Sequence, residues 1–160
     1  MTPVVLFDWG DTLMRDIPGA TGRMSDWPEV AAMPGAEETL RCLSRAARLY
    51  LATGAADSTA EDIRSALRRV DLDRYISGCF CPRITGFKKP DRRFFLTVLE
   101  TLAVPAQEVT MVGDSLQNDI LPCHDLGMPT VLLATTPPAG LPAGTRVIGS
   151  LAELCRWFRL

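Results

Sequence analysis

The residues best suited to chemistry in this sequence are acids, a threonine and a lysine placed at the ends of short apolar runs. Asp8 directly follows VVLF, Thr53 follows LYLA, and Asp114 follows VTMVG. Asp119 lies five residues beyond Asp114, and Lys89 directly precedes a proline. If the runs are neighbouring parallel strands, their carboxyl ends lie along one edge of a sheet, which is where such folds place ligands. These side chains would then converge.

That combination of side chains suits phosphoryl transfer. Clustered carboxylates repel one another unless a divalent cation such as Mg²⁺ lies among them. A carboxylate beside such a cation could attack phosphorus, while Thr53 and Lys89 hold the transferring oxygens and offset the charge that develops. The pattern therefore predicts a Mg²⁺ site and a phosphorylated substrate.

The elements that must position these residues are short apolar runs separated by helical patterns. This alternation predicts an α/β fold, a three-layer α/β/α Rossmann-like arrangement with a mainly parallel central sheet. The predicted strands are Val4–Phe7, Leu49–Ala52, Val109–Val112, Thr130–Ala134 and Arg146–Ile148, with Gly78–Cys81 as a weaker candidate.

Apolar residues at helical spacing predict helices over Ala36–Ala47, Ser58–Val70 and Arg92–Leu102. Asp57 and Ser58 with Glu61 resemble a capping box, and Gly127 suits the end of a fourth helix that starts near Leu116. The C-terminal stretch with Leu151, Leu154, Trp157 and Phe158 predicts a terminal amphipathic helix.

Composition limits the class of protein. The chain has 160 residues, of which 47% are hydrophobic and 22% charged, and its net charge of −2 lacks the basic excess of a nucleic-acid binder. Five scattered cysteines with a single histidine, His124, favour reduced core thiols over a zinc site. The first residues resemble neither a signal peptide nor a membrane span. We expect one cytoplasmic domain over residues 1–160, with no nucleic acid or membrane as partner.

Four short motifs follow one another along most of the chain, roughly residues 4–134. They are Asp8-Trp9-Gly10-Asp11-Thr12-Leu13, Thr53-Gly54, Lys89-Pro90-Asp91 and the run Gly113-Asp114-Ser115-Leu116-Gln117-Asn118-Asp119. In this order and at these strand ends and helix starts, they resemble the four motifs of the haloacid dehalogenase-like hydrolases.

The resemblance implies a role for each matching residue. Asp8 would be the nucleophile that forms an aspartyl-phosphate, and Thr53, Gly54 and Lys89 would bind the phosphoryl group. The metal ligands would be Asp8, the backbone carbonyl of Gly10 and Asp114, with Asp119 supporting the metal through water or orienting Lys89. Lys88 is expected to be solvated, because the lysine of the family directly precedes the proline.

The first motif departs from the family pattern at Gly10. That position normally holds an aspartate that protonates the leaving group and later activates water, whereas here the second acid is Asp11. Glycine still offers a carbonyl to the metal, but loss of a positioned acid costs roughly 10²–10⁴ in rate. Several explanations stay open: Asp11 is a displaced acid, the leaving group needs no acid, the domain turns over poorly, or the reaction is not a phosphatase reaction. A solvent-facing or turn-stabilising role for Asp11 is equally open.

Little of the chain is left for a cap domain. The intervals from Asp8 to Thr53 and from Thr53 to Lys89 are filled by one helix and one strand each, apart from residues 15–33, which we expect to form a flap over the site. Arg15, Arg23 and Trp27 are candidates for substrate contacts. Family members with little or no cap often act on large substrates or assemble, so a homo-oligomer is an open expectation. The rival function is a catalytically weak phosphate- or metal-binding domain with a regulatory or scaffolding role.

Overall fold

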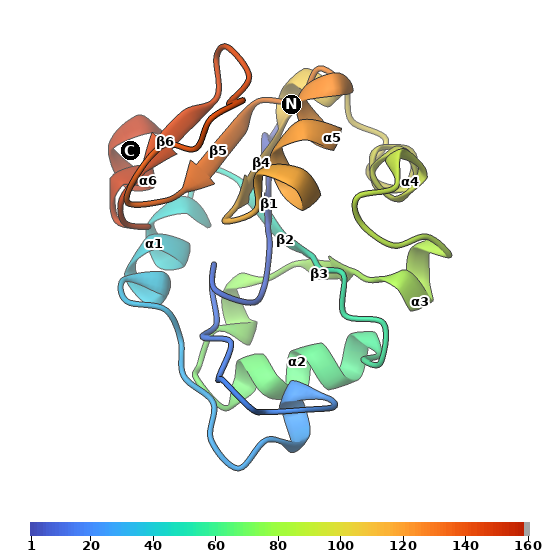
Figure 1. Cartoon of the computed structure of the whole chain (residues 1–160), viewed down its shortest axis with the longest axis vertical. Coiled ribbons are helices and arrows are strands. Elements are labelled where there is room, and N and C mark those ends of the chain that lie inside the picture. The colour runs from blue at the N-terminus through green and yellow to red at the C-terminus, as the bar shows by residue number, and fades with distance from the viewer. Residues whose placement is uncertain (159–160) are drawn as a thin grey trace.

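The apolar runs pair side by side in a computed structural model of the chain, which describes residues 1–158 (Figure 1). Within these residues one parallel sheet has six strands in the order β3-β2-β1-β4-β5-β6. The strands are β1 (Val4–Phe7), β2 (Arg48–Ala52), β3 (Gly78–Phe80), β4 (Val109–Gly113), β5 (Thr130–Leu133) and β6 (Arg146–Ile148). The predicted strands, including the weaker one, are confirmed to within one residue at their ends.

Helices cover both faces of the sheet and complete three layers. The α-helices are α1 (Ala36–Leu43), α2 (Ala60–Arg68), α3 (Pro82–Thr85), α4 (Arg92–Leu102), α5 (Leu121–Asp125) and α6 (Glu153–Trp157). Short 3₁₀ turns form η1 (Met24–Asp26), η2 (Asp73–Tyr75) and η3 (Ala106–Glu108), and a π-helical turn forms η4 (Leu116–Ile120). The predicted α/β/α Rossmann-like fold is therefore confirmed.

Strand β1 lies in the middle of the sheet and is buried on both faces. Val5 and Phe7 belong to the core beneath α1, α2 and α6, whereas Val4 and Leu6 belong to the core beneath α4 and α5. Successive strand residues point to opposite faces, so a central parallel strand needs an unbroken apolar run such as VVLF. The first polar residue after this run can only lie at the strand end.

The helix predictions hold in position but need correction at their ends. Helix α4 has the predicted bounds, while α1 ends at Leu43, before the predicted Ala47. The capping box of α2 is formed by Thr59 and Asp62, so the prediction of Asp57–Ser58 with Glu61 was wrong. Thr59 Oγ1 accepts from the amide of Asp62, whose carboxylate accepts from the Thr59 amide, which fixes the start of α2.

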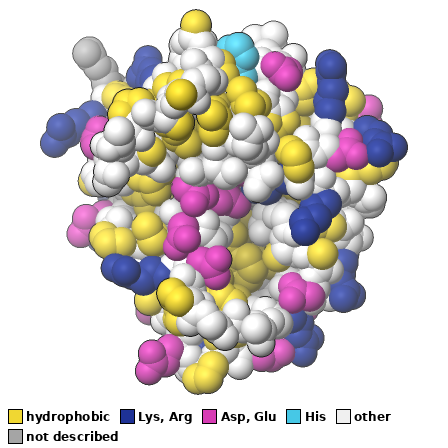
Figure 2. Space-filling model, in the orientation of Figure 1, with side chains coloured by type: hydrophobic (Ala, Val, Ile, Leu, Met, Phe, Trp, Pro, Cys, Tyr) yellow, Lys and Arg dark blue, Asp and Glu magenta, His cyan; other side chains and the backbone are white. Residues whose placement is uncertain are grey.

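The strand order reverses direction at β1, which has β2 on one side and β4 on the other. Phe7 pairs in register with Leu51 of β2 and with Val112 of β4, so the three strands end at the same level. In open α/β sheets such a reversal leaves a crevice beyond the carboxyl ends of the strands. Figure 2 shows acidic side chains gathered around a hollow in the middle of the viewed face.

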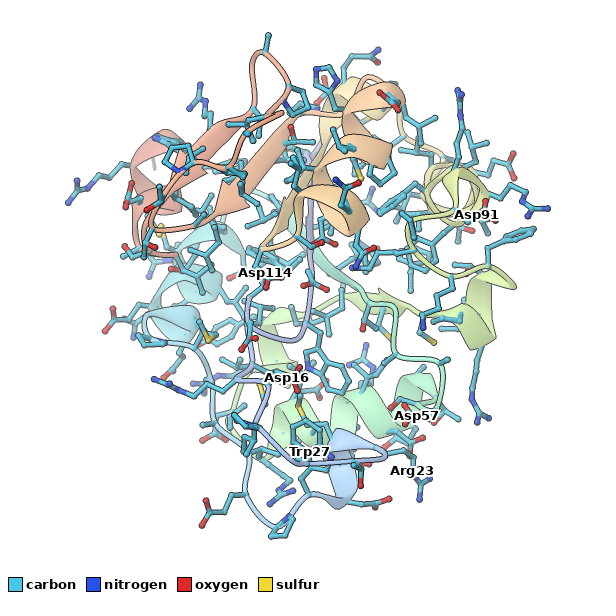
Figure 3. All side chains as sticks on the ribbon, viewed as in Figure 1. Asp16, Arg23, Trp27, Asp57, Asp91 and Asp114 are labelled. Atoms are coloured by element: carbon cyan, nitrogen blue, oxygen red, sulfur yellow. The ribbon has the colours of Figure 1, made fainter. Side chains whose placement is uncertain are left out.

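The predicted flap, residues 15–33, has its two ends bonded to each other, and its last residue is bonded to the chain that precedes it. The amide of Arg15 donates to the carbonyl of Ala31 at 2.8 Å, and the amide of Met33 donates to Leu13 O at 2.8 Å. Between these bonds, Met24 and Trp27 are buried in the same core cluster as Ile63 and Leu67 of α2; Trp27 is labelled in Figure 3. The segment therefore forms a packed wall beside the sheet edge.

The guanidinium of Arg69, just beyond α2, holds this wall from outside. It donates to the carbonyl oxygens of Ser25, Trp27 and Pro28 at 3.4, 2.6 and 3.1 Å. Three carbonyls that would otherwise need water thus share one cation. No helix within residues 1–158 is long and apolar enough to cross a membrane.

Candidate active site

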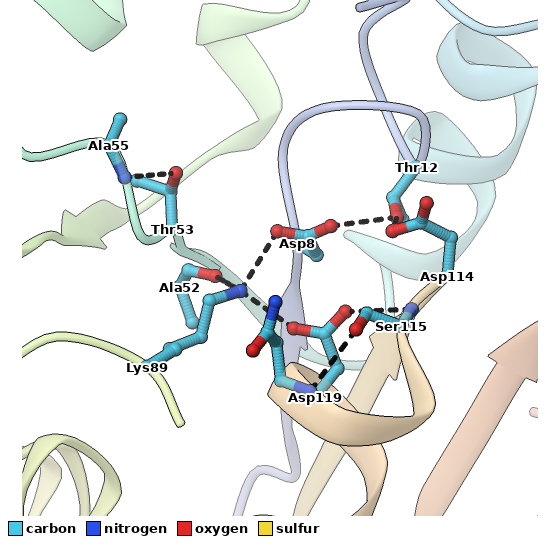
Figure 4. Close-up of polar contacts among 10 residues, drawn as sticks. Asp8, Thr12, Ala52, Thr53, Ala55, Lys89, Asp114, Ser115 and Asp119 are labelled. Atoms are coloured by element: carbon cyan, nitrogen blue, oxygen red, sulfur yellow. Dashed lines mark hydrogen bonds and ion pairs between the residues drawn. The ribbon is translucent and has the colours of Figure 1, made fainter. Parts of the chain in front are cut away.

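Asp8 is the first residue beyond β1, and its backbone amide still continues the ladder by donating to Val112 O at 2.9 Å. Its carboxylate therefore leaves the sheet at the crevice between β1 and β4 (Figure 4). Oδ1 accepts from Lys89 Nζ at 2.9 Å, and Oδ2 accepts from the hydroxyl of Thr12 at 3.3 Å. The side chain is 14% exposed, so it is held in place and still open to a ligand.

Lys89 is buried at the centre of this arrangement, with its side chain 5% exposed. Its ammonium donates to Asp8 Oδ1, to Asp119 Oδ1 at 2.6 Å and to the carbonyl of Ala52 at 2.8 Å. Burial alone would lower its pKa, but the charges of Asp8 and Asp119 outweigh burial and hold the pKa above its ordinary value. All three donors of a charged Lys89 are thus used.

Asp119 is fully buried at the start of the segment that leads into α5. Its Oδ1 binds Lys89, and its Oδ2 accepts from the amide of Ser115 at 3.2 Å. The helical turn itself is capped by Ser115, whose hydroxyl accepts from the amide of Asn118 at 3.1 Å. Asp119 therefore contacts both Lys89 and the amide of the residue that caps the helical turn.

Gly113 is needed for this placement of Asp119. A Cβ atom at Gly113 would lie 2.2 Å from Asp119 Oδ2 and 2.6 Å from Asp119 Cβ. Two atoms that are not bonded to each other cannot lie this close together, so any side chain at position 113 would displace Asp119. The glycine that ends β4 lets the acid lie against the strand.

Asp114 lies at the exposed rim, where its Oδ1 accepts from the hydroxyl of Thr12 at 3.4 Å. Thr12 is fully buried, and it contacts both Asp8 and Asp114. Sequence reasoning gave Thr12 no role beyond its place in the first motif. The single hydroxyl proton of Thr12 can be donated to only one carboxylate at a time. Thr12 therefore lies between Asp8 and Asp114 and can bind either of them.

The acids at this edge form a set that fits a divalent cation. Asp8, Asp114 and Asp119 each offer a carboxylate oxygen, and these atoms all lie within 4.8 Å of one another. Partial burial and the neighbouring Asp8 raise the pKa of Asp114 to about 7. Burial, opposed by Lys89, raises the pKa of Asp119 to about 6. Oxygen donors that repel one another in this way are suited to a hard cation such as Mg²⁺.

Beside these acids lies a pocket of about 250 Å³, which we call the acid pocket. It is lined by Asp8, Gly10, Asp11, Asp16, Gly54, Lys88, Lys89, Asp114, Ser115, Asn118 and Asp119. The predicted phosphate-binding Gly54 and Lys89 are among them, while Thr53 lines a second pocket next to it. Thr53 is buried, and its hydroxyl oxygen accepts from the amide of Ala55 at 3.1 Å.

Asp11 lines the acid pocket, but its hydrogen bonds stabilise a turn. It has a positive φ of 56°, its amide donates to Met14 O at 2.6 Å, and its Oδ1 accepts from the amide of Asp16 at 3.0 Å. Short polar side chains tolerate this backbone region and stabilise turns in this way. The arrangement favours the turn-stabilising interpretation of Asp11.

The three candidates for substrate contacts separate in the structure. Trp27 lines the second pocket, whereas Arg15 is exposed and Arg23 pairs with Asp26 and Asp62 at 2.8 and 3.4 Å. His124 lies exposed on α5, with its ring near Ala143 O.

Two residues of the site had no signal in the sequence analysis. Asp16 lines both the acid pocket and the second pocket, and Trp9 lines the second pocket. Asp16 belongs to an aperiodic stretch, and Trp9 lies between motif residues with no expected side-chain role. Only the path of the chain brings them to the site.

Comparisons with known proteins agree with the geometry. The family model of haloacid dehalogenase-like hydrolases matches residues 23–127. A phosphoglycolate phosphatase of Agrobacterium fabrum is 34% identical over 99 residues, which cover 61% of this chain and 41% of that enzyme. The matched part spans under half the length of the curated relatives.

Solved structures share the whole fold. An uncharacterized protein of Listeria monocytogenes serotype 4b superposes with a TM-score of 0.83 at 22% identity, over 97% of this chain and 96% of that one. The putative hydrolase YfnB of Bacillus subtilis, described as bound to magnesium, has a TM-score of 0.76 at 19% identity, over 99% of each chain. With the family match over most of its length, this chain belongs to the haloacid dehalogenase-like hydrolases.

Proposed function

We propose that the chain is a Mg²⁺-dependent phosphatase that acts on phosphorylated small molecules through an aspartyl-phosphate on Asp8. The observation that carries this proposal is the position of Asp8. It lies at the reversal of strand order, with one carboxylate oxygen bound to the buried Lys89 and two further acids beside it. The phosphoglycolate phosphatase relative supports a phosphorylated substrate.

Each neighbour of Asp8 then has a chemical task. Lys89 neutralises Asp8 in the resting protein and would bind a phosphoryl oxygen in the complex, since an ammonium can exchange one acceptor for another. Thr53 and the backbone at Gly54 would bind the remaining oxygens from the other side. Asp119 holds Lys89 in position through the 2.6 Å contact, which favours orientation of Lys89 over direct binding of the metal.

Asp8, the carbonyl of Gly10 and Asp114 would hold Mg²⁺, with Asp119 behind them. When bound, the ion supplies positive charge that neutralises the carboxylates and the phosphoryl oxygens together. Asp8 attacks phosphorus, and the phosphorus–oxygen bond to the alcohol breaks with its electron pair leaving on the alcohol oxygen. Water then cleaves the aspartyl-phosphate and restores the Asp8 carboxylate.

The test is turnover together with trapping of the intermediate. Purified protein with Mg²⁺ should hydrolyse p-nitrophenyl phosphate or acetyl phosphate, and rapid acid quenching should capture one phosphoryl group on Asp8 by mass spectrometry. Asp8→Asn should abolish both signals. Asp125→Asn, the same substitution at an exposed position of α5, should leave both intact.

Three results would contradict the proposal. If Asp8→Asn kept the activity of the unmodified protein, Asp8 would not be the nucleophile. If a broad panel of phosphate esters gave no turnover while the protein still bound Mg²⁺ or phosphate, the rival binding role would be favoured. Halide release from a 2-haloacid in place of phosphate release would indicate the non-phosphatase reaction.

A further inference from the structure

A second pocket, of about 190 Å³, opens beside the acid pocket, and we call it the tryptophan pocket. It is lined by Trp9, Gly10, Asp16, Gly22, Met24, Trp27, Thr53, Ala55, Asp57 and Ser58. Gly10 and Asp16 line both pockets, so they stand where the two meet. In Figure 3, Asp16 lies between Asp114 on one side and Trp27 on the other.

Trp9 gives the tryptophan pocket an aromatic wall. Trp9 is only 4% exposed, and its indole N–H has no hydrogen-bond partner within residues 1–158. Buried indole N–H groups usually find a partner, because leaving one unpaired in a dry environment is costly. Its nitrogen has almost no exposed surface, so a ligand in the pocket would contact the ring of Trp9 and would not reach this donor.

Breaking a phosphate ester requires a proton for the oxygen that leaves. Of the acids in the acid pocket, Asp119 is held by Lys89 and by the amide of Ser115, and Asp114 lies in the carboxylate cluster. The carboxylate of Asp11 is tied to the turn through the Asp16 amide. Asp16 is the acid of this pocket that lines the tryptophan pocket as well, where a leaving group would lie.

The absence of a side chain at Gly10 gives Asp16 its place. A Cβ atom at Gly10 would lie 3.8 Å from Asp16 Cβ and 4.0 Å from Asp16 Oδ2. The Asp16 carboxyl therefore occupies the space next to the one that a side chain at position 10 would enter. The carboxyl group of Asp16 and that of an aspartate at position 10 could therefore reach the same point of the acid pocket, although they start from different positions on the backbone.

We propose that Asp16 is the general acid and base of the reaction and that the tryptophan pocket holds the leaving alcohol. This inference rests on the proposed function. As Asp8 attacks phosphorus, the Asp16 carboxyl gives its proton to the departing oxygen, so the alcohol leaves neutral and Asp16 becomes a carboxylate. That carboxylate then takes a proton from water, whose oxygen attacks the phosphorus. The bond to Asp8 breaks, and phosphate, the Asp8 carboxylate and protonated Asp16 result.

The lining also selects the class of alcohol. Asp16 and Asp57 bring negative charge to the tryptophan pocket, and among its described lining residues none is a lysine or arginine. An anionic leaving group would be repelled, whereas an uncharged or cationic one would not. A pocket of about 190 Å³ is smaller than the roughly 300–1,000 Å³ of typical sites for drug-sized ligands. The leaving group is therefore a small uncharged or cationic alcohol.

The decisive experiment compares two leaving groups in Asp16→Asn. Glycerol phosphate releases a poor leaving group that needs a proton, whereas p-nitrophenyl phosphate releases a stable anion that does not. We expect Asp16→Asn to slow the first turnover of glycerol phosphate by roughly 10²–10⁴. The burst of p-nitrophenol should be retained, with slower steady-state turnover because the base that activates water is also lost.

Matched variants separate this chemistry from a structural effect. Glu29→Gln removes an exposed carboxylate from the same segment and should change neither substrate's rate. Asp11→Asn keeps an acceptor for the Asp16 amide and removes the charge, so it tests Asp11 as the acid without undoing the turn. Adding Gly10→Asp to Asp16→Ala should restore much of that rate, since the space beside position 10 is then open.

Each alternative result has a distinct meaning. If Asp16→Asn hydrolyses glycerol phosphate as fast as the unmodified protein while Asp8→Asn is inactive, the role of Asp16 is refuted and the proposed function stands. A loss in Asp11→Asn in place of Asp16→Asn would assign the acid to Asp11. If the unmodified protein hydrolyses neither ester, the proposed function fails, and the assignment of Asp16 fails with it.

Discussion

Replacing Lys89 by methionine tests whether the buried ammonium holds the acids of the site together. In Lys89→Met, Asp8 and Asp119 lose contacts of 2.9 and 2.6 Å, and the carbonyl of Ala52 loses a donor at 2.8 Å. Asp119 is fully buried, so its charge would remain in the core without a cation. Breaking a buried ion pair in this way costs about 3–5 kcal/mol, and we expect that loss in the free energy of unfolding at about pH 8 in the presence of a chelator.

The loss should depend on pH in a defined direction. Burial raises the pKa of Asp119 to about 6 even with Lys89 opposing it, and removing Lys89 would raise it further. A group whose pKa is raised in the folded state contributes stability below its unfolded value and loses it as the pH rises through the folded value. Near pH 5 Asp119 of the variant is therefore protonated, and the loss should shrink to about 1–2 kcal/mol, the cost of the unmade hydrogen bond at Ala52.

The assay is urea unfolding followed by circular dichroism at both pH values, with Lys88→Met as the matched control. Lys88 is the exposed neighbour of Lys89, so its replacement should leave the free energy of unfolding nearly unchanged. The slope of the free energy of unfolding against urea concentration should be the same in the variants and in the unmodified protein. An equal slope would show that the substitutions leave the unfolded state unaffected. A loss equal to that of Lys88→Met at pH 8, or a loss of the same size at both pH values, would refute the reasoning.

Three further predictions follow from the site and its walls. Gly113→Ala should lower the free energy of unfolding by about 2–3 kcal/mol, because its Cβ would lie 2.2 Å from Asp119 Oδ2; stability equal to the unmodified protein would show that this close approach does not exist. Binding of Mg²⁺ near pH 6 should release about one proton, since the raised pKa values of Asp114 and Asp119 keep protons there that the ion replaces, whereas near pH 9 the release should vanish. Calorimetry in two buffers of different ionisation enthalpy measures this release, and heats independent of buffer at pH 6 would contradict it. Arg69→Met should speed hydrogen exchange at the amides of Asp26 and Trp27 by freeing the carbonyls that Arg69 holds, and unchanged exchange there would show that the segment needs no such tie.

The elements of the fold could be predicted because their signals are local. A central parallel strand must be apolar on both faces, so VVLF could hardly be anything else, and the spacing of Phe94, Phe95 and Val98 marks α4. Helix ends were predicted less well, since the choice between Ser58 and Thr59 as the cap depends on which hydroxyl meets a free amide. The α/β/α architecture follows from the alternation of these elements.

The convergence of Asp8, Lys89 and Asp119 was also predictable from the sequence. Each acid or cation follows a strand or precedes a helix, and a parallel sheet brings such positions to one edge. The sequence did not show which contacts each of these groups makes. That Asp119 binds Lys89, that Thr12 contacts two carboxylates and that Asp11 serves a turn depend on distances of a few ångströms between separate elements.

Sequence by itself determined the class of fold, the edge at which the site lies and the family motifs, because these rest on periodicity and on residue types at strand ends. Tertiary structure alone decided which acid stands beside Gly10. Asp16 comes from an aperiodic segment whose path is set by its internal bond from Arg15 to Ala31, by the bond of its last residue to Leu13 and by the burial of Trp27. No local pattern encodes that path, since it results from the packing of the whole segment against α2 and the sheet.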